Sequence, residues 1–344
     1  MTKIIELRNV TKIFSSGFIF NRQRTIAADN ITLSVDEENP SITALAGESG
    51  SGKTTLFLLM MGQIKPTQGE VYYRGKNIEK LSKEENKQLK RELQPIYQDP
   101  FAAYNPFYKV DHVLTTPLKR FNLSNSPAMT SDMIHKALEL VGLRPAETLG
   151  RTPIQLSGGQ RQRLMIARAI LCQPKMILAD EPVSMVDASL RATILASLVT
   201  LNRNLGIPII YITHDITTAY QICDNIVILY AGSVAETGST ETIIRDPKHP
   251  YTQLLISAIP LPDRKQPWLS TQIEEKATTN VVQSNGCKFA NRCPKCMPRC
   301  LVERPPLYQT DSHQAVACFL YSHQPKVVSD DISDMFIKHR SSNS

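Results

Sequence analysis

The sequence predicts an α/β fold in which short buried strands alternate with amphipathic helices. Three short apolar runs, at residues 42–46, 176–179 and 208–212, are bounded by polar residues. Such runs are typical of strands buried on both faces of a parallel sheet. Between them, residues 132–143 repeat apolar side chains at helical spacing. Strands that alternate with helices indicate a sheet covered by helices.

Length and charge limit the function classes. A chain of 344 residues is too long for one average core and suggests a large domain with an appendage. The net charge is +7, but no dense run of Lys and Arg is present, and residues 83–91 mix both signs. A solvated surface therefore explains the basic balance better than a nucleic-acid site. The apolar stretch 56–61 is too short to span a bilayer, and no N-terminal signal is visible, so a cytoplasmic protein is expected.

A phosphate-binding motif follows the first apolar run. The pattern G-x-x-x-x-G-K-S/T occupies residues 47–54, between a predicted strand and a predicted helix at 54–61. Glycines let successive backbone N–H groups point at phosphate oxygens, and the helix N-terminus adds its positive dipole end. Lys53 is expected to reach the β- and γ-phosphates of ATP, and the Thr54 hydroxyl to bind Mg²⁺. The expected nucleotide-binding residues are Gly47, Glu48, Ser49, Gly50, Ser51, Gly52, Lys53, Thr54 and Thr55.

Two adjacent acidic residues end the apolar run at 176–179. Asp180 is expected to hold Mg²⁺ at the carboxyl end of this strand. Glu181 is expected to orient the attacking water and to accept its proton. Alone, the Asp-Glu pair would be read as a solvated strand end, but the phosphate-binding motif favours a catalytic role. Loss of such a base typically slows a reaction by about 10²–10⁴-fold.

A second glycine motif reads Leu-Ser-Gly-Gly-Gln at residues 156–160 and precedes a helical segment. Ser157 could simply cap this helix. Two glycines at a helix N-terminus also expose backbone amides to a phosphate group. The expected nucleotide contacts are Ser157, Gly158, Gly159 and Gln160.

With this motif beside the phosphate loop, the chain resembles the nucleotide-binding subunits of ABC transporters over roughly residues 1–260. The resemblance implies a RecA-like P-loop ATPase core with an antiparallel β subdomain and a helical subdomain at about 99–170. It also implies a head-to-tail dimer, in which the signature at 156–160 of one subunit covers ATP bound to the other.

Four further positions match the family one by one. Gln98 resembles the glutamine that contacts Mg²⁺ or the attacking water, and His214 resembles the histidine that hydrogen-bonds the γ-phosphate. Asp187 matches the aspartate of the D-loop, although Val186 departs from the usual leucine. Phe14 is the expected platform for adenine, since stacking requires only an aromatic face. Phe18 and Phe20 compete for that role, and a core phenylalanine remains an alternative.

Beyond the ATPase domain, predicted at 1–258, the composition changes. Residues 259–285 are rich in proline and polar residues, which predicts a linker. Residues 286–321 contain five cysteines, and residues 322–344 read as a polar, frayed tail. In a cytosolic ATPase such a cluster indicates metal binding rather than disulfides. The thiolates suffice for Zn²⁺ or for an iron–sulfur cluster, and unliganded cysteines remain an alternative.

The cysteine-rich segment resembles the C-terminal region of the oligopeptide/dipeptide subfamily, as does His-Pro-Tyr-Thr-Gln-Leu-Leu at residues 249–255. The subfamily implies a 4Fe–4S cluster, and its ligands would be Cys287, Cys293, Cys300 and Cys318. Cys296 is an additional cysteine, and with Cys293 it could instead bind Zn²⁺.

The resemblance implies an ATP-hydrolysing subunit at the cytoplasmic face of a membrane. Its partners would be two transmembrane permease subunits, a second, non-identical ATPase subunit and, indirectly, an extracytoplasmic substrate-binding protein. Oligopeptides or dipeptides are the expected substrates, with oligosaccharides or nickel as alternatives. A soluble ATPase that acts on nucleic acid or the ribosome is the alternative class. It is disfavoured because the chain has one ATPase half and no long insertion between Gln98 and Leu156, so no nucleic-acid partner is expected. The cysteine segment could also act as a redox or nucleic-acid sensor attached to this ATPase.

Overall fold

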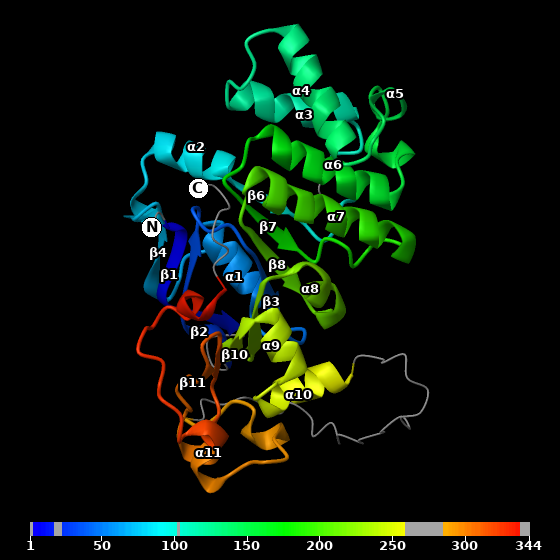
Figure 1. Cartoon of the computed structure of the whole chain (residues 1–344). Helices are drawn as coiled ribbons and strands as arrows, with labels where there is room; N and C mark the ends of the chain where they lie inside the picture. The colour runs from blue at the N-terminus through cyan, green and yellow to red at the C-terminus, as the bar shows by residue number, and fades with distance from the viewer. Residues whose placement is uncertain (1–2, 17–22, 102–103, 259–284, 338–344) are drawn as a thin grey trace, which may run out of the picture.

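A computed structural model of the chain describes residues 3–16, 23–101, 104–258 and 285–337. Figure 1 shows a central sheet with a helical layer at one end and the C-terminal segments at the other. No helix within these ranges is long and apolar enough to cross a membrane.

The larger sheet has eight strands in the order β11-β12-β10-β9-β3-β8-β7-β6. The pairs between β9, β3, β8, β7 and β6 are parallel, whereas β10, β12 and β11 join by antiparallel pairs. The predicted α/β class is therefore confirmed, and the three predicted strands are β3, β7 and β8. The bounds are β3 (Ile42–Ala46), β6 (Leu93–Ile96), β7 (Met176–Asp180), β8 (Ile209–Thr213), β9 (Asn225–Tyr230), β10 (Ser233–Ser239), β11 (Tyr308–Asp311) and β12 (Gln314–Val316).

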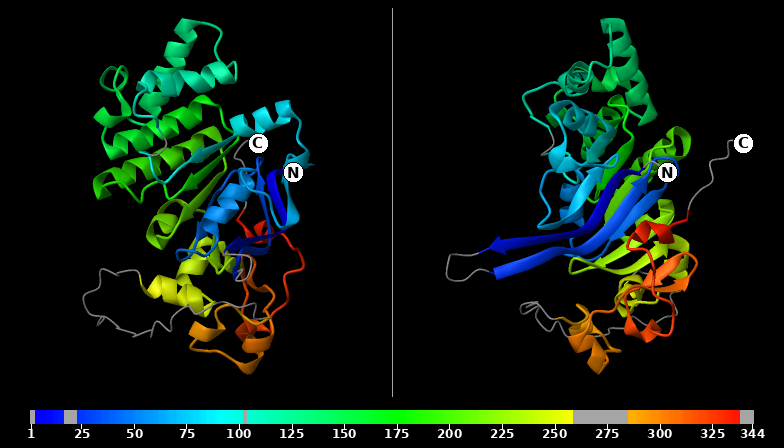
Figure 2. Two further views of the ribbon diagram at one scale, coloured as in Figure 1. Left: turned by 180° about the vertical axis from the view of Figure 1, so that it is seen from behind. Right: turned by 90° about the vertical axis from the view of Figure 1, so that its left-hand side faces the viewer.

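A second, antiparallel sheet has the order β2-β1-β4-β5. Its long strands β1 and β2 extend away from the body of the molecule (Figure 2, right). Helix α1 (Lys53–Met60) contacts both sheets, and its buried face, including Phe57 and Leu59, joins them in one apolar core. The second sheet comprises β1 (Lys3–Ser16), β2 (Gln23–Asp36), β4 (Gln68–Tyr73) and β5 (Lys76–Asn77).

The helical layer is formed by helices between residues 110 and 171. Helix α6 packs against both α3 and α4. In α4, Ile134, Ala137 and Leu138 are buried, as their spacing predicted. The layer comprises α3 (Val110–Arg120), α4 (Pro127–Leu140), α5 (Pro145–Thr148), η2 (Pro153–Gln155) and α6 (Gly158–Leu171). The other helices before the C-terminal region are η1 (Ile78–Lys80), α2 (Lys83–Glu92), α7 (Ala188–Leu205), α8 (Ile216–Ile222), α9 (Thr240–Arg245) and α10 (Pro250–Ser257).

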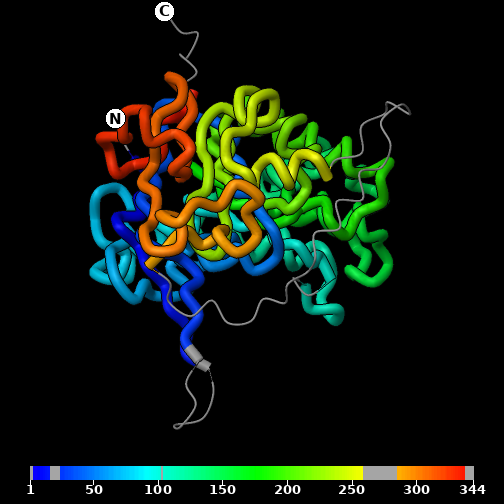
Figure 3. The backbone as a smooth tube through the Cα atoms, turned by 90° about the horizontal axis from the view of Figure 1, so that it is seen from below, coloured from blue at the N-terminus to red at the C-terminus, as the bar shows by residue number. Residues whose placement is uncertain are grey.

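The cysteine-rich region is joined to the core more closely than an appendage would be. Strand β12 pairs with β10, so Glu236 faces Val316 and the large sheet continues into this region. Viewed from below, the segment after residue 285 lies across the end of the core (Figure 3). Its short helices are η3 (Ala290–Arg292), α11 (Pro298–Val302) and η4 (Phe319–Tyr321). The predicted linker at 259–285 lies, apart from Asn285, outside the described residues.

The prediction of a frayed tail after residue 321 is wrong for residues 322–337. Helix η5 (Ile332–Met335) packs on β2 and β10, with Ile332 buried in the core between the sheets. Asp331 accepts hydrogen bonds from the Ser34 hydroxyl at 2.6 Å and from Lys3 at 2.9 Å. The few apolar side chains of this polar segment, among them Ile332, Met335 and Phe336, have no regular spacing and were too sparse a signal to predict this docking.

Candidate nucleotide site

The phosphate loop connects β3 to α1 and needs glycine at two of its positions. Gly47 has φ 152° and Gly52 has φ 106°. A Cβ at Gly47 would lie 2.2 Å from the Leu229 carbonyl oxygen, and one at Gly52 would lie 2.1 Å from that of Ala27. Both contacts are with backbone that cannot move aside, so the motif's glycines are required by packing as well as by the turn.

Lys53 lies inside this loop, as its place in the motif predicts. Its ammonium donates to the carbonyl oxygens of Gly47 at 2.7 Å and Glu48 at 2.8 Å. Burial lowers the pKa of Lys53, while the nearby carboxylates of Glu181 and Asp180 oppose that shift. Thr54 is exposed at the start of α1, and Thr55 is half-buried beside it. The loop thus gathers one cation, a hydroxyl and a helix N-terminus, which together suit a polyphosphate.

Glu181 lies at the carboxyl end of β7, between two polar side chains from neighbouring loops. The Gln98 amide donates to one of its carboxylate oxygens at 3.0 Å, and His214 Nδ1 lies 2.9 Å from the other. Glu181 itself has φ 44°, a left-handed conformation that is uncommon for a non-glycine residue. Parallel strands bring these three residues, which are far apart in the sequence, to one edge of the sheet.

Asp180 precedes Glu181 and faces the same site. Burial raises the pKa of Asp180 to about 6, and the neighbouring Glu181 carboxylate adds to the shift while Lys53 opposes it. Two adjacent carboxylates beside a single ammonium favour a divalent cation, because hard oxygen ligands are those that Mg²⁺ prefers. The donor set of Thr54, Asp180 and Gln98 therefore fits Mg²⁺.

The second glycine motif forms a capped helix start at α6. The Ser157 hydroxyl accepts from the Gln160 amide at 3.2 Å, and the Gln160 side chain accepts in return from Ser157 N at 2.9 Å. Gly159 packs so closely on Leu190 that a Cβ would lie 2.4 Å from it. Within the described ranges, no hydrogen bond or ion pair joins residues 156–160 to residues 47–55. The two motifs are thus separate surfaces of one chain.

The remaining predicted nucleotide contacts are exposed. Phe14 on β1 is 42% exposed, and the Lys12 ammonium lies 5.3 Å from its ring centroid. Asp187 is exposed at the start of α7, and the neighbouring Val186 is buried. The competing Phe18 and Phe20 lie outside the described residues.

The cysteine-rich region does not contain the formed metal site that was expected. No group of three Cys, His, Asp or Glu side chains within the described ranges has an arrangement that could hold a metal ion. Four of the cysteines nevertheless line one small cavity, and the fifth, Cys296, is exposed and is not among the lining residues. Burial and the neighbouring thiols raise the pKa of Cys318 to about 11. The four around the cavity are Cys287, Cys293, Cys300 and Cys318.

Two residues that reach the phosphate loop were missed by sequence reasoning. The Tyr251 hydroxyl, on α10, accepts from the Glu48 amide at 2.8 Å. The guanidinium of Arg292, on η3, donates to both carboxylate oxygens of Glu48 at 2.8 and 2.9 Å. Neither residue lies in a nucleotide-binding motif, so only the fold reveals these contacts.

Comparisons with known proteins agree with this geometry. The profile of the ABC transporter family matches residues 28–184, and that of the oligopeptide/dipeptide transporter C-terminal region matches residues 235–300. YkfD of Bacillus subtilis, which carries the name of an oligopeptide transport ATP-binding protein, is 37% identical over 92% of this chain and 95% of its own length. The oligopeptide transport ATP-binding protein OppF of Haemophilus influenzae is 35% identical over 80% of this chain and 83% of its own length.

Solved structures give the same result. The dimeric ATP-binding cassette MJ0796, in a post-hydrolysis state bound to ADP and Pi, matches with a TM-score of 0.60 and 28% identity. The match covers 69% of this chain and 98% of that one. The subunit cbiO1 from Clostridium perfringens, part of the ABC transporter complex cbiONQ, gives 0.59 and 25%, over 72% of this chain and 92% of its own. Together with the phosphate loop and the residues around Glu181, these matches show that the chain belongs to the ATP-hydrolysing ATP-binding proteins of ABC transporters, in the group that carries the oligopeptide/dipeptide transporter C-terminal region.

Proposed function

We propose that this chain is one of two ATPase subunits that power an ABC importer of oligopeptides or dipeptides. The observation that carries the ATPase role is the Glu181 carboxylate, held between Gln98 and His214 beside the phosphate loop. The match of residues 235–300 to the oligopeptide/dipeptide region, together with the names of YkfD and OppF, supports the substrate class. Oligosaccharide and nickel importers are the alternatives that the transport test must separate.

The chemistry assigned to this site is hydrolysis of the γ-phosphate. The backbone amides of residues 47–54 and the Lys53 ammonium bind the phosphates. Glu181 orients a water molecule and takes its proton as the water oxygen attacks phosphorus, while ADP leaves with the β–γ bridging oxygen. Thr54, Asp180 and Gln98 would hold Mg²⁺, which neutralises charge on the phosphate oxygens.

A complete site requires a second subunit in this proposal. Within the described ranges, residues 156–160 make no hydrogen bond or ion pair with the phosphate loop of the same chain, and Ser157 is exposed at the start of α6. This helix start would cover ATP bound to a partner subunit. Asp187, exposed nearby, would lie in the same interface. The partner is proposed to be a second, non-identical ATPase subunit.

The importer would also contain two transmembrane permease subunits and receive substrate from an extracytoplasmic binding protein. The chain would then work at the cytoplasmic face of the membrane. Closure of the ATPase dimer would press the helical subdomain against the permeases and switch the side from which the pore is open. An ATPase that acts on nucleic acid instead would bind it tightly and lose that binding with salt.

The four cysteines around the C-terminal cavity are proposed to bind a 4Fe–4S cluster, with Zn²⁺ as the alternative. Their convergence supports this assignment, and the exposure of Cys296 favours the four-cysteine set. Binding requires the thiols to lose their protons and to draw together into ligating positions. Iron and acid-labile sulfide in protein purified without oxygen would support the cluster, whereas stoichiometric zinc without sulfide would favour the alternative.

The transport proposal is tested on the complex of this chain with its membrane and ATPase partners in vesicles. Peptide delivered by the cognate binding protein should stimulate ATP hydrolysis and enter the vesicles. The Glu181→Gln complex should bind ATP and remain closed without turnover. Stimulation by an oligosaccharide or by nickel, and not by peptides, would refute the substrate class.

A further inference from the structure

The cysteine-rich region makes a two-point ion pair with the phosphate loop. Arg292 donates to both oxygens of the Glu48 carboxylate, and Glu48 is the second residue of the loop. The carbonyl of Glu48 accepts from Lys53, the cation proposed to bind the phosphates. A single loop residue thus connects the C-terminal region with the phosphate-binding lysine.

Arg292 is itself held in place by its surroundings. Its guanidinium carbon lies 5.7 Å from the ring centroid of Tyr230 and 5.6 Å from that of Phe289. Its own amide closes a turn by donating to the Phe289 carbonyl at 3.0 Å. The Cys287 amide donates to the Cys300 carbonyl at 2.7 Å and fixes the start of the same segment. The arginine therefore reaches the loop from an ordered support.

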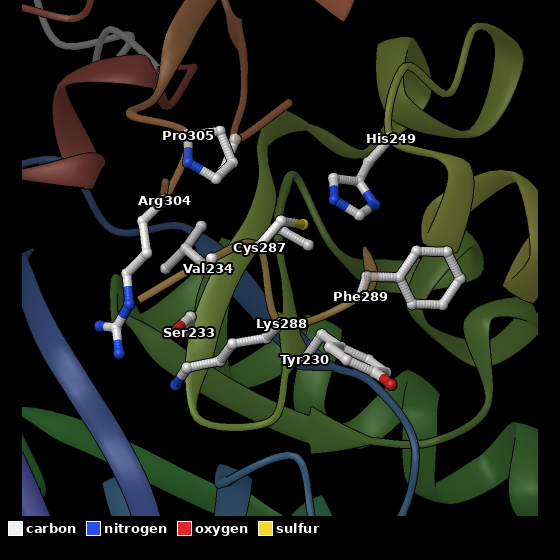
Figure 4. A pocket seen from close by; sticks show the side chains of 12 residues that line it. Tyr230, Ser233, Val234, His249, Cys287, Lys288, Phe289, Arg304 and Pro305 are labelled. Carbon is white, nitrogen blue, oxygen red and sulfur yellow. The ribbon is translucent and has the colours of Figure 1, made fainter. Parts of the chain in front are cut away.

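Lys288, four residues earlier, supports the loop by a second route. Its ammonium donates to the Ala231 carbonyl at 2.7 Å and pairs with Asp29 at 2.8 Å. Ala231 belongs to the turn after β9, where the Gly232 amide donates to the Ser51 carbonyl of the phosphate loop at 2.9 Å. Figure 4 shows Lys288 beside Tyr230 among the residues that line one cavity, to which the end of β9 and the C-terminal segment both contribute.

We propose that Arg292 is a positioning residue for ATP binding, and that the cysteine-rich region stabilises the phosphate loop through it. The inference rests on the proposed ATP site. The pair matters because a loop already fixed in its binding conformation loses less entropy when ATP binds. Its loss should weaken ATP binding more than it slows the chemical step, because Arg292 touches neither Glu181 nor its partners.

The expected effect is moderate. Arg292 and Glu48 are 27% and 39% exposed, so solvent screens the pair, while the bidentate geometry strengthens it. Arg292→Ala should raise the KM for ATP about two- to fivefold, with kcat changed by less than about twofold.

The experiment compares variants of the assembled transporter and of the full-length chain. ATP hydrolysis gives KM and kcat, and hydrogen exchange of the peptide covering residues 47–56 reports the order of the loop without ATP. Arg292→Ala should raise the KM and speed exchange in that peptide. Arg292→Lys should recover only part of the effect, since an ammonium cannot form the two-point contact.

Arg299→Ala is the matched control, because Arg299 lies in the same region but pairs with Glu303 and packs over Phe319. It should leave both readouts as in the wild type. If Arg292→Ala does not fold, Glu48→Gln tests the same pair from the other side. Equal KM values and equal loop exchange in either pair variant and the wild type would overturn the inference. A wild-type complex that hydrolyses no ATP would instead count against the proposed function.

Discussion

Replacing His214 by alanine removes one of the two contacts that orient the Glu181 carboxylate. Nδ1 of His214 lies 2.9 Å from one oxygen, and a carboxylate oxygen accepts, so Nδ1 is the nitrogen that carries the proton. Gln98 still donates to the other oxygen at 3.0 Å. The carboxylate should therefore keep its place but rotate more freely, and the attacking water should be aligned less often.

The expected loss of turnover depends on how strongly the exposed His214 side chain binds the Glu181 carboxylate. The His214 side chain is 59% exposed, so its bond to Glu181 is worth less than a buried charge-assisted bond, about 1–2 kcal/mol. Lost entirely from the transition state, that energy slows turnover by roughly 5- to 30-fold. ATP affinity should change by less than about twofold, because the contact between His214 and Glu181 is expected to act on the transition state and not on bound ATP in the ground state.

The assay is phosphate release by the assembled transporter at saturating ATP, with affinity measured separately by a fluorescent ATP analogue. Gln98→Ala should give a loss of similar size, and His323→Ala, at an exposed position in the C-terminal region, should have no effect. A His214→Ala complex with normal turnover, or one that loses only ATP affinity, would refute the assignment of His214 as the partner of the base.

Three further predictions concern stability, pH and the loop. Asp331→Ala should lower the free energy of unfolding by about 2–3 kcal/mol in chemical denaturation, because Ser34 N and Oγ lose a buried acceptor; unchanged stability would mean that the tail is not docked. Asp180 has its pKa raised to about 6, so Mg²⁺-dependent ATP affinity should fall as the pH drops below 6, and a titration flat from pH 7.5 to 5.5 would contradict this. Gly52→Ala should weaken ATP binding by at least about tenfold in equilibrium titrations, because its Cβ would meet the Ala27 carbonyl; wild-type affinity would show that the backbone can yield.

The ATPase core was largely predictable from the sequence. Short apolar runs predicted β3, β7 and β8, because strands that are buried on both faces of a parallel sheet consist mainly of apolar residues. The phosphate loop was predictable because the local backbone geometry of such a loop requires glycine at fixed positions. Gln98 and His214 could be assigned only by resemblance, because strand order, and not spacing, brings them to Glu181.

The C-terminal region, which contains β12 and the cysteines, was less predictable for physical reasons. The pairing of β12 with β10 joins residues about 80 apart, and no local pattern encodes such a contact. The same is true of Arg292 and Glu48, which are 244 residues apart. The cysteines were recognised by their clustering, but clustering did not produce ligating geometry within the described residues. Most of the features that could not be predicted from the sequence therefore depend on contacts between residues far apart in the chain.

Hydrolysis at Glu181 is proposed to drive peptide import. The most direct measurement compares peptide uptake and phosphate release in vesicles that contain the complex of this chain with its partners, in wild-type and Glu181→Gln forms. We expect peptide-stimulated hydrolysis and uptake for the wild type, and ATP binding without hydrolysis or uptake for the variant. Uptake by the Glu181→Gln complex at the wild-type rate would show that hydrolysis at Glu181 does not drive import.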